Sequence, residues 1–219
     1  YGEYGQNFYN RGADYSVTSF HVPHDFKLTW IYDLPFGPQG RWLNDGVVAS
    51  VLGGWTVSAI QRYRSGNPLR LTAGGYDGQA LFNRQFRGAV LLPHDEWFLG
   101  DAPDDVNPST GTPYLNPAAF GRPPATGNNV PIRLGTAPRW FSNLRGFPIS
   151  SEDLSLIKRS ALGFREEASF EIRMDVINLF NRVRLGSPSM NINNLNQFGR
   201  IFGKIGGPRI IQLGLRINF

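Results

Sequence analysis

The sequence predicts an all-β protein: an antiparallel transmembrane β-barrel segment of about six strands, incomplete alone, with one long extracellular loop. Apolar and polar residues alternate over several segments of about ten residues, the length that a tilted strand needs to cross a bilayer. No run of 18 or more apolar residues occurs, which excludes a transmembrane helix but not a barrel strand. The 26 glycines and 16 prolines among 219 residues favour turns and strand ends over helices.

Residues 1–73 are predicted to hold the first barrel strands, paired as a hairpin. From Asp25 to Leu34 the residues alternate between apolar and polar, with Ile31 as the single exception. Alternation resumes from Trp55 to Arg64, after a connection rich in glycine and proline. Because successive side chains of a strand point to opposite faces, each of these segments has one apolar and one polar side.

Residues 74–145 lack sustained alternation and are rich in Gly, Pro, Asn and Asp. Loops of this length are usually functional or disordered, and outer-membrane barrels place their long loops outside the cell. We therefore expect one long extracellular loop over this range. Just before it, Leu69 and Leu71 could extend the second strand, although Pro68 argues for an edge, a bulge or a new start.

Residues 146–219 are predicted to form the carboxy-terminal barrel strands. Alternation restarts at Asp153, is clear from Glu167 to Val176, and follows a short turn that suits the periplasmic side. A further strand is expected over Phe198–Ile205. The last strand, Arg209–Phe219, alternates strictly and ends on an aromatic residue.

The polar sides of these strands carry charges that we interpret as facing the barrel lumen. They are Arg62, Arg64, Glu171, Arg173, Asp175 and Arg216. Together with Asp153 and Arg159, most of them are expected to form a ladder of opposite charges between adjacent strands.

The charge of the chain is unevenly distributed: residues 1–132 hold 9 Lys+Arg and 11 Asp+Glu, whereas 133–219 hold 13 and 6. Nucleic-acid binding is not favoured, because the arginines sit singly at alternate strand positions.

Aromatic residues near the expected strand ends fit the girdles that mark a membrane interface. The candidates are Trp30, Tyr32, Trp55, Tyr63 and Phe180. A soluble β-sandwich core would also alternate, but it would need a second sheet to cover so many large apolar side chains.

We expect no catalytic residues, no cofactor and no metal, and hence not an enzyme. The chain has no cysteine, and Pro23 between His21 and His24 makes their convergence on a metal improbable. Turn or interface roles suit these histidines and His94 better. A second set of oxygen ligands lacks the glycine and the terminal glutamate of a calcium loop. This set is Asp101, Asp104, Asp105 and Asn107.

Two acidic residues on one strand do not make a hydrolytic pair either. Glu171 and Asp175 stand about 13 Å apart along the strand, too far for the two carboxylates of a glycosidase. The sequence also contains none of the common nucleophile, zinc-protease or phosphate-loop motifs.

Short motifs follow one another along the chain in a recognisable order. The first group is His24-Asp25-Phe26, Leu34-Pro35-Phe36-Gly37, Leu52-Gly53-Gly54-Trp55, Ser65-Gly66-Asn67-Pro68 and Tyr114-Leu115-Asn116-Pro117-Ala118-Ala119-Phe120. The second is Asp175-Val176-Ile177-Asn178-Leu179-Phe180-Asn181, Phe198-Gly199-Arg200-Ile201 and Pro208-Arg209-Ile210-Ile211-Gln212-Leu213. Spanning nearly the whole chain, they resemble the carboxy-terminal barrel of TonB-dependent outer-membrane receptors. The resemblance is greatest to the Oar-like group, whose members carry a carboxypeptidase-regulatory-like amino-terminal domain.

The resemblance implies uptake of a large, scarce ligand through a plugged barrel in a Gram-negative outer membrane. It implies energy from the TonB system of the inner membrane, acting through a short amino-terminal box. It also implies that assembly machinery recognises the terminal strand, whose signal would be Leu213, Leu215, Ile217 and Phe219. About six strands cannot close a barrel of roughly 22, so we expect a fragment or a mature carboxy-terminal piece. Its partners would be outer-membrane lipid and the missing plug and barrel strands of the same protein.

Two other functions stay open at this point. Copies of the chain could pair edge to edge into an extracellular ring or filament, because an open sheet leaves unpaired backbone groups at both edges. A soluble carbohydrate-binding sandwich that uses residues 74–145 is the third hypothesis.

Overall fold

The computed structural model describes residues 10–38, 40–72, 88–123, 135–161 and 168–219, and strands dominate them. The long strands are β1 (Asp25–Asp33), β2 (Trp55–Arg64), β6 (Ile149–Ala161), β7 (Ser169–Ile177) and β11 (Ile210–Asn218). The two-residue strands are β3 (Ala89–Val90), β4 (Thr112–Pro113), β5 (Phe120–Gly121), β8 (Arg184–Leu185), β9 (Arg200–Ile201) and β10 (Lys204–Ile205). The helices are α1 (Gly46–Leu52) and the 3-10 turns η1 (Arg11–Asp14), η2 (His94–Glu96) and η3 (Pro117–Ala119). Within these ranges, no helix has the length and apolar character needed to cross a membrane.

The chain divides into two compact units, each built from three segments. The sheet unit comprises 24–64, 149–183 and 206–219, and the loop unit comprises 1–23, 65–148 and 184–205. The described part of 74–145 is therefore no separate loop, because it folds together with residues 184–205, far away in the sequence. In chain order, the loop-unit segments precede β1, join β2 to β6 and join β7 to β11.

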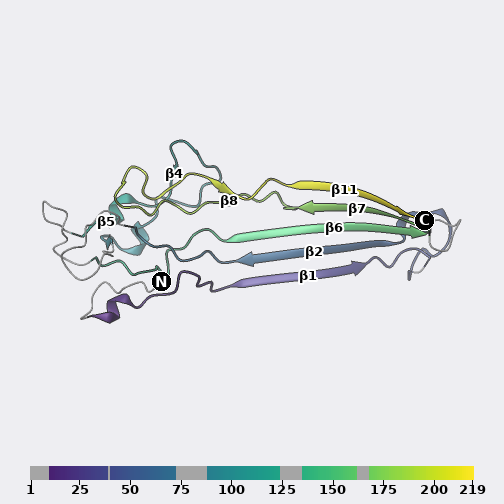
Figure 1. Ribbon diagram of the computed structural model, residues 1–219, viewed down its shortest axis with the longest axis horizontal. Helices are drawn as coiled ribbons and strands as arrows, with labels where there is room; N and C mark the ends of the chain where they lie inside the picture. The colour runs from purple at the N-terminus through teal and green to yellow at the C-terminus, as the bar shows by residue number, and fades with distance from the viewer. Residues whose placement is uncertain (1–9, 39, 73–87, 124–134, 162–167) are drawn as a thin grey trace. The chain divides into compact units, whose positions relative to one another are not determined.

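The sheet unit contains one antiparallel sheet in the order β1-β2-β6-β7-β11 (Figure 1). The predicted hairpin of the first two strands is present, with Asp25 opposite Arg64 and Asp33 opposite Thr56. β6 starts at Ile149, a little before the alternation becomes visible in the sequence. Each described residue of the two edge strands, β1 and β11, is exposed.

Directly opposite residues share a face of the sheet across all five strands, and one face is mainly apolar while the other is mainly polar. We call one side the apolar face and the other the polar face. The apolar face carries Phe26, Leu28, Trp30, Tyr32, Val57, Ala59, Leu154, Leu156, Phe170, Ile172, Met174, Val176, Ile211, Leu213, Leu215 and Ile217. The polar face carries Asp25, Lys27, Thr29, Thr56, Ser58, Arg62, Arg64, Asp153, Ser155, Arg159, Glu171, Arg173, Asp175, Gln212, Arg216 and Asn218, with several isoleucines between them.

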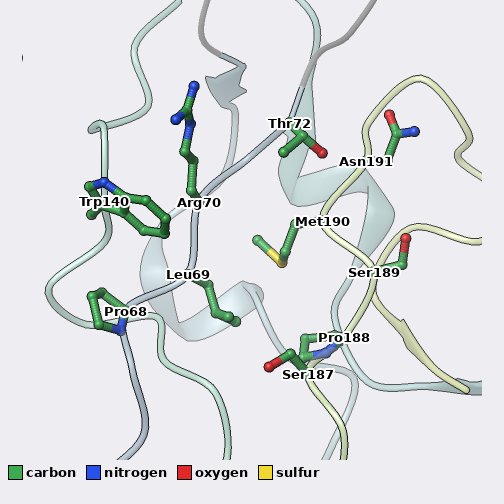
Figure 2. Close-up of a pocket in the computed structure, with 10 residues that line it drawn as sticks. All are labelled: Pro68, Leu69, Arg70, Thr72, Trp140, Ser187, Pro188, Ser189, Met190 and Asn191. Atoms are coloured by element: carbon green, nitrogen blue, oxygen red, sulfur yellow. The ribbon is translucent and has the colours of Figure 1, made fainter. Parts of the chain in front are cut away.

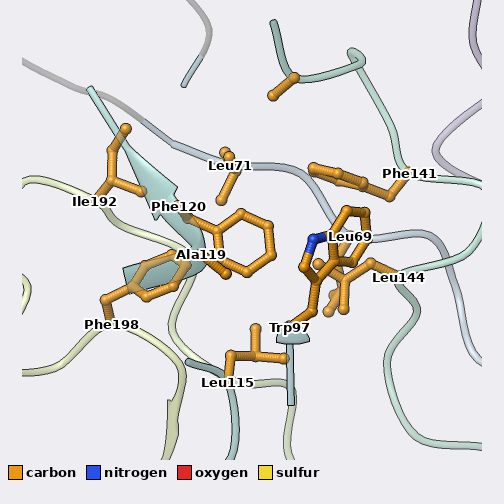
Figure 3. Packing of buried hydrophobic residues seen from close by; sticks show 11 residues of the cluster. Leu69, Leu71, Trp97, Leu115, Ala119, Phe120, Phe141, Leu144, Ile192 and Phe198 are labelled. Carbon is orange, nitrogen blue, oxygen red and sulfur yellow. The ribbon is translucent and has the colours of Figure 1, made fainter. Parts of the chain in front are cut away.

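The loop unit has a hydrophobic core of its own (Figure 3). Phe120 lies at its centre, with its ring centroid 5.3 Å from that of Trp97 and 5.4 Å from that of Phe198. Phe141 stacks edge-on against Trp97 at 5.3 Å. Leu69, Leu71, Leu115, Ala119, Ala137, Leu144 and Ile192 complete the cluster. These residues come from distant parts of the chain, so the core joins the segments of the unit.

Two expected strand features are wrong. Leu69 and Leu71 do not extend β2, which ends at Arg64; they are buried in the loop-unit core, where the Leu69 N–H donates to the Leu144 carbonyl at 2.9 Å. The strand expected over Phe198–Ile205 is replaced by β9 and β10, so the sheet has five long strands among the described residues.

The chain cannot run straight through 198–205 because Gly199 adopts φ = 71°. Phe198 and Ile201, on either side of it, are both buried. A Cβ atom at Gly199 would lie 2.6 Å from the Leu115 carbonyl oxygen, closer than real Cβ contacts allow. Glycine is needed here both for its backbone conformation and for the close approach.

We predict that Leu144→Ala destabilises the loop unit by about 2–5 kcal/mol, because its fully buried side chain leaves a cavity. Leu195→Ala is the matched control, since Leu195 is 55% exposed in the same unit and should change stability by less than about 0.5 kcal/mol. The free energy of unfolding is measured from protease resistance of the loop unit across a urea series. Equal losses for the two variants would show that this core is not formed.

Gly199→Ala should destabilise the same unit by about 1–3 kcal/mol, because alanine is strained at this backbone angle and has no space there. The control is Gly203→Ala, since an added Cβ at Gly203 meets no atom within 4 Å. The same urea series measures both variants. A Gly199→Ala protein as stable as the Gly203→Ala protein would disprove the tight turn at 199.

Candidate functional site

The polar face of the sheet brings charges from neighbouring strands together. Arg62 binds Asp25 with two contacts, Nε to Oδ1 at 3.0 Å and Nη2 to Oδ2 at 2.8 Å. Arg64 lies on the same face of β2. This bidentate geometry fixes the guanidinium plane and links the edge strand β1 to β2.

The other end of the sheet has a similar arrangement on β6, β7 and β11. Arg159 Nε lies 2.7 Å from Glu171 Oε2, and these residues are directly opposite in register. Arg216 of β11 faces Glu171 from the other side. On β7, Arg173 Nε lies 2.7 Å from Asp175 Oδ2, and Ser155 also donates to Asp175. Acidic residues and arginines thus lie next to one another on the polar face across β6, β7 and β11.

All six charged residues interpreted as lumen-facing therefore share one face of the sheet. Their orientation toward a lumen stays a prediction. Their chemistry is that of ion pairs, because each described carboxylate among them has an arginine or a hydroxyl as partner. Exposed pairs of this kind contribute little to stability, so the value of the charges lies in keeping this face polar.

The aromatic candidates occupy different depths of the apolar face. Tyr32 and Trp55 lie where β1 ends and β2 begins. At the opposite strand ends, Tyr63 stacks on Phe26 with ring centroids 6.4 Å apart. Trp30 is further inside, opposite Ala59. Membrane-interface positions for these residues stay a prediction.

Phe180 and the residues of the proposed assembly signal lie apart from the aromatic residues of β1 and β2. Phe180 is exposed just after β7, with the Arg182 guanidinium 5.3 Å from its ring centroid. On β11, Leu213, Leu215 and Ile217 point along the exposed apolar face, and Phe219 follows the strand. Their role as an assembly signal stays a prediction.

The apolar face also holds two charged residues that the sequence analysis missed. Glu152 stands in register with Gln61 of β2, yet its side chain is only 1% exposed. Arg182 Nε binds both of its carboxylate oxygens, at 3.0 and 2.9 Å, and the Tyr63 hydroxyl is a further partner. The Glu152 carboxylate raises the pKa of Arg182, which lies beyond β7, above its ordinary value.

The second missed charge is Lys158, six residues along the same strand and 8% exposed. Its ammonium group donates to the carbonyls of Ser50, Val51 and Gly53, each at 2.8 Å. It also lies 5.4 Å from the ring centroid of Trp55. Glu152 lies two residues before Leu154, and Lys158 lies two residues after Leu156. The alternation of this strand therefore predicts that both charged residues lie on the apolar face.

The loop unit contains a pocket of about 530 Å³ (Figure 2). Met190 lies in its middle, with Trp140 and Arg70 on one side and Ser189 and Asn191 on the other. The Arg70 guanidinium carbon is 5.9 Å from the Trp140 ring centroid. An aromatic surface beside a cation, hydroxyls and an amide suits a ligand with both polar and apolar parts. The residues come from three distant segments, so no local pattern in the sequence predicts the pocket.

Several of the residues considered as metal ligands, namely His21, His94 and Asp105, have other partners. Arg145 contacts both the carbonyl and the Nδ1 atom of His21, each at 3.0 Å, and His94 packs on Trp97 with ring centroids 4.7 Å apart. Lys204 Nζ lies 2.8 Å from Asp105 Oδ1. Hydrogen bonds from Lys204 and from the Val106 N–H lower the pKa of that carboxyl.

In the described part of the chain, no three His, Asp or Glu side chains come together in a way that could hold a metal ion. Asn107, the remaining candidate with an amide oxygen, accepts the backbone N–H groups of Ser109 and Thr110 at 2.9 and 3.1 Å. It therefore stabilises the local turn.

Comparison with known proteins agrees with the two-faced sheet. A family model described as "Outer membrane beta barrel domain" matches residues 1–212. Neither the curated proteins nor the solved structures contain a match to the chain. The match confirms the all-β barrel class and the outer-membrane location that the alternation predicts. This chain therefore belongs to the outer membrane beta barrel domain family.

Proposed function

We propose that this chain is the carboxy-terminal barrel portion of a TonB-dependent outer-membrane transporter that takes up a large, scarce ligand. One observation carries the proposal: the connections between the long strands are very unequal. The connections at 65–148 and 178–209 supply the folded loop unit, whereas those at 34–54 and 162–168 are shorter. Outer-membrane barrels expose long loops to the outside and short turns to the periplasm. On this basis, the loop unit is extracellular.

An extracellular loop unit with its own core and pocket supports a receptor role. A barrel that served only as an anchor would not need a packed cluster around Phe120 between its strands. The pocket beside Trp140 and Arg70 offers a ligand a first contact. The proposal involves no reaction and gives this chain no catalytic role.

The polar face supports a ligand path. Inside a barrel, the ion-paired residues Arg62, Arg173 and Asp175 would line a hydrated lumen, while the apolar face would meet lipid. Two of the sequence motifs that resemble the Oar-like group lie at strand boundaries: Leu52–Trp55 links α1 to β2, and Asp175–Asn181 spans the end of β7.

The open edges of the sheet determine the partners in this proposal. Among the residues that the structure describes, β1 and β11 each pair with a strand on one side only, and unpaired backbone groups are not tolerated in lipid. Five strands are also too few to close a barrel, for which eight is about the minimum. Further strands and a plug of the same protein would complete the barrel, and a TonB-type inner-membrane protein would supply the energy.

The same two edges favour one alternative function. If copies of the chain paired β1 to β11, a ring or filament would form through repeated contacts of one type. This assembly would also cover the edges, so the edges alone do not decide between the two functions.

Intact-mass measurement of the native protein, with particle size in the absence of detergent, separates them. The transport proposal predicts a polypeptide much heavier than the 24.4 kDa of this chain, which crosslinks to a TonB-type protein in energised cells. A polypeptide of about 24.4 kDa in large ordered particles would refute transport and favour assembly.

A further inference from the structure

The helix α1, in the connection between β1 and β2, exposes an apolar stripe. Val47 is 80% exposed, Val48 55%, Val51 58% and Leu52 42%. Residues spaced by four lie on the same side of a helix, so these four side chains form one continuous strip. Ala49, on the opposite side, is buried. This arrangement is the reverse of that of a helix facing water, which would turn its apolar side inward.

Several carbonyl groups at the end of α1 accept hydrogen bonds from protein side chains. The last carbonyls of a helix have no partner within it, and on a wet surface water usually supplies one. Here Lys158 Nζ donates to the carbonyls of Ser50, Val51 and Gly53, and Trp55 Nε1 donates to Val51 at 3.1 Å. In lipid, where water is absent, every backbone carbonyl needs such a donor.

The end of α1 is held by two residues of the apolar face of the sheet, Lys158 of β6 and Trp55 of β2. They are directly opposite each other and lie on the same face of the sheet as the neighbouring pair Leu156 and Val57. The helix is therefore fixed at one end of the face that an outer-membrane barrel turns toward lipid. Its sequence, Gly46 to Leu52, contains no charged residue, so nothing in it opposes burial in an apolar medium.

We propose that α1 is an interfacial helix of the outer membrane, with Val47, Val48, Val51 and Leu52 inserted among phospholipid chains at the rim of the barrel. Lys158 is kept as a buried cap because it satisfies the carbonyls that this environment leaves without water. In the proposed orientation the lipid is that of the periplasmic leaflet. Contact with lipid itself depends on the barrel and not on transport.

The test uses the full-length protein in vesicles of phosphatidylethanolamine and phosphatidylglycerol. Nitroxide labels are attached at Val48→Cys and Val51→Cys, and within these 219 residues no native cysteine competes for the label. Collision rates are then measured with oxygen, which is enriched in lipid, and with a water-soluble nickel chelate. Leu99→Cys is the matched control, since Leu99 is a 56% exposed leucine of the loop unit.

We expect an oxygen-to-nickel collision ratio several-fold higher at positions 48 and 51 than at position 99. Ratios equal to that of Leu99→Cys would mean that α1 faces water and would overturn the proposal. Labels shielded from both reagents would mean that a protein partner covers the stripe, which overturns it as well. Either result leaves ligand uptake untouched, so failure here is distinct from failure of the transport proposal.

A second pair of variants tests the same contact without a label. Val51→Asp should lower the membrane-inserted, urea-resistant fraction several-fold, because it places a carboxylate in lipid. Val51→Leu should insert like the unaltered protein. Normal insertion of the Val51→Asp protein would contradict lipid contact at this position.

Discussion

The alternation of apolar and polar residues, aligned through one register, is the constraint on which the rest of the structure depends. From β1 to β11 the directly opposite residues share a face, so Phe26 meets Tyr63 on one side and Lys27 meets Arg62 on the other. A slip of one residue would exchange the two faces of a strand and place arginines in lipid. The ion pairs of the polar face and the exposed leucines of β11 both follow from this register.

Two buried charged residues interrupt the apolar face of the sheet. Glu152 and Lys158 lie on the apolar face but are separated by six residues, or about 20 Å along the strand. Each charge is buried and fully engaged, Glu152 by Arg182 and Lys158 by the end of α1. An unpaired charge at either position would be costly.

The sheet could largely be predicted from the sequence, whereas the loop unit could not. Strand periodicity is local, so β1, β2, β7 and β11 are visible in short windows of residues. The loop-unit core combines residues from 69 to 198 with no common period. Leu69 was therefore considered as an extension of a strand, and Phe198 was expected to begin one. The pocket beside Trp140 was missed for the same reason. Glu152 and Lys158 were within reach of the sequence, because their position relative to Leu154 and Leu156 places them on the apolar face.

The central claim, that the apolar face of this sheet meets lipid, can be tested along β11. Single cysteines at Leu213, Leu215, Gln212 and Arg216 of the full-length protein are labelled with bimane, and quenching by brominated phospholipid is measured. The account predicts strong quenching at Leu213 and Leu215 and little at Gln212 and Arg216. Equal quenching at all four positions, or the reverse pattern, would contradict it.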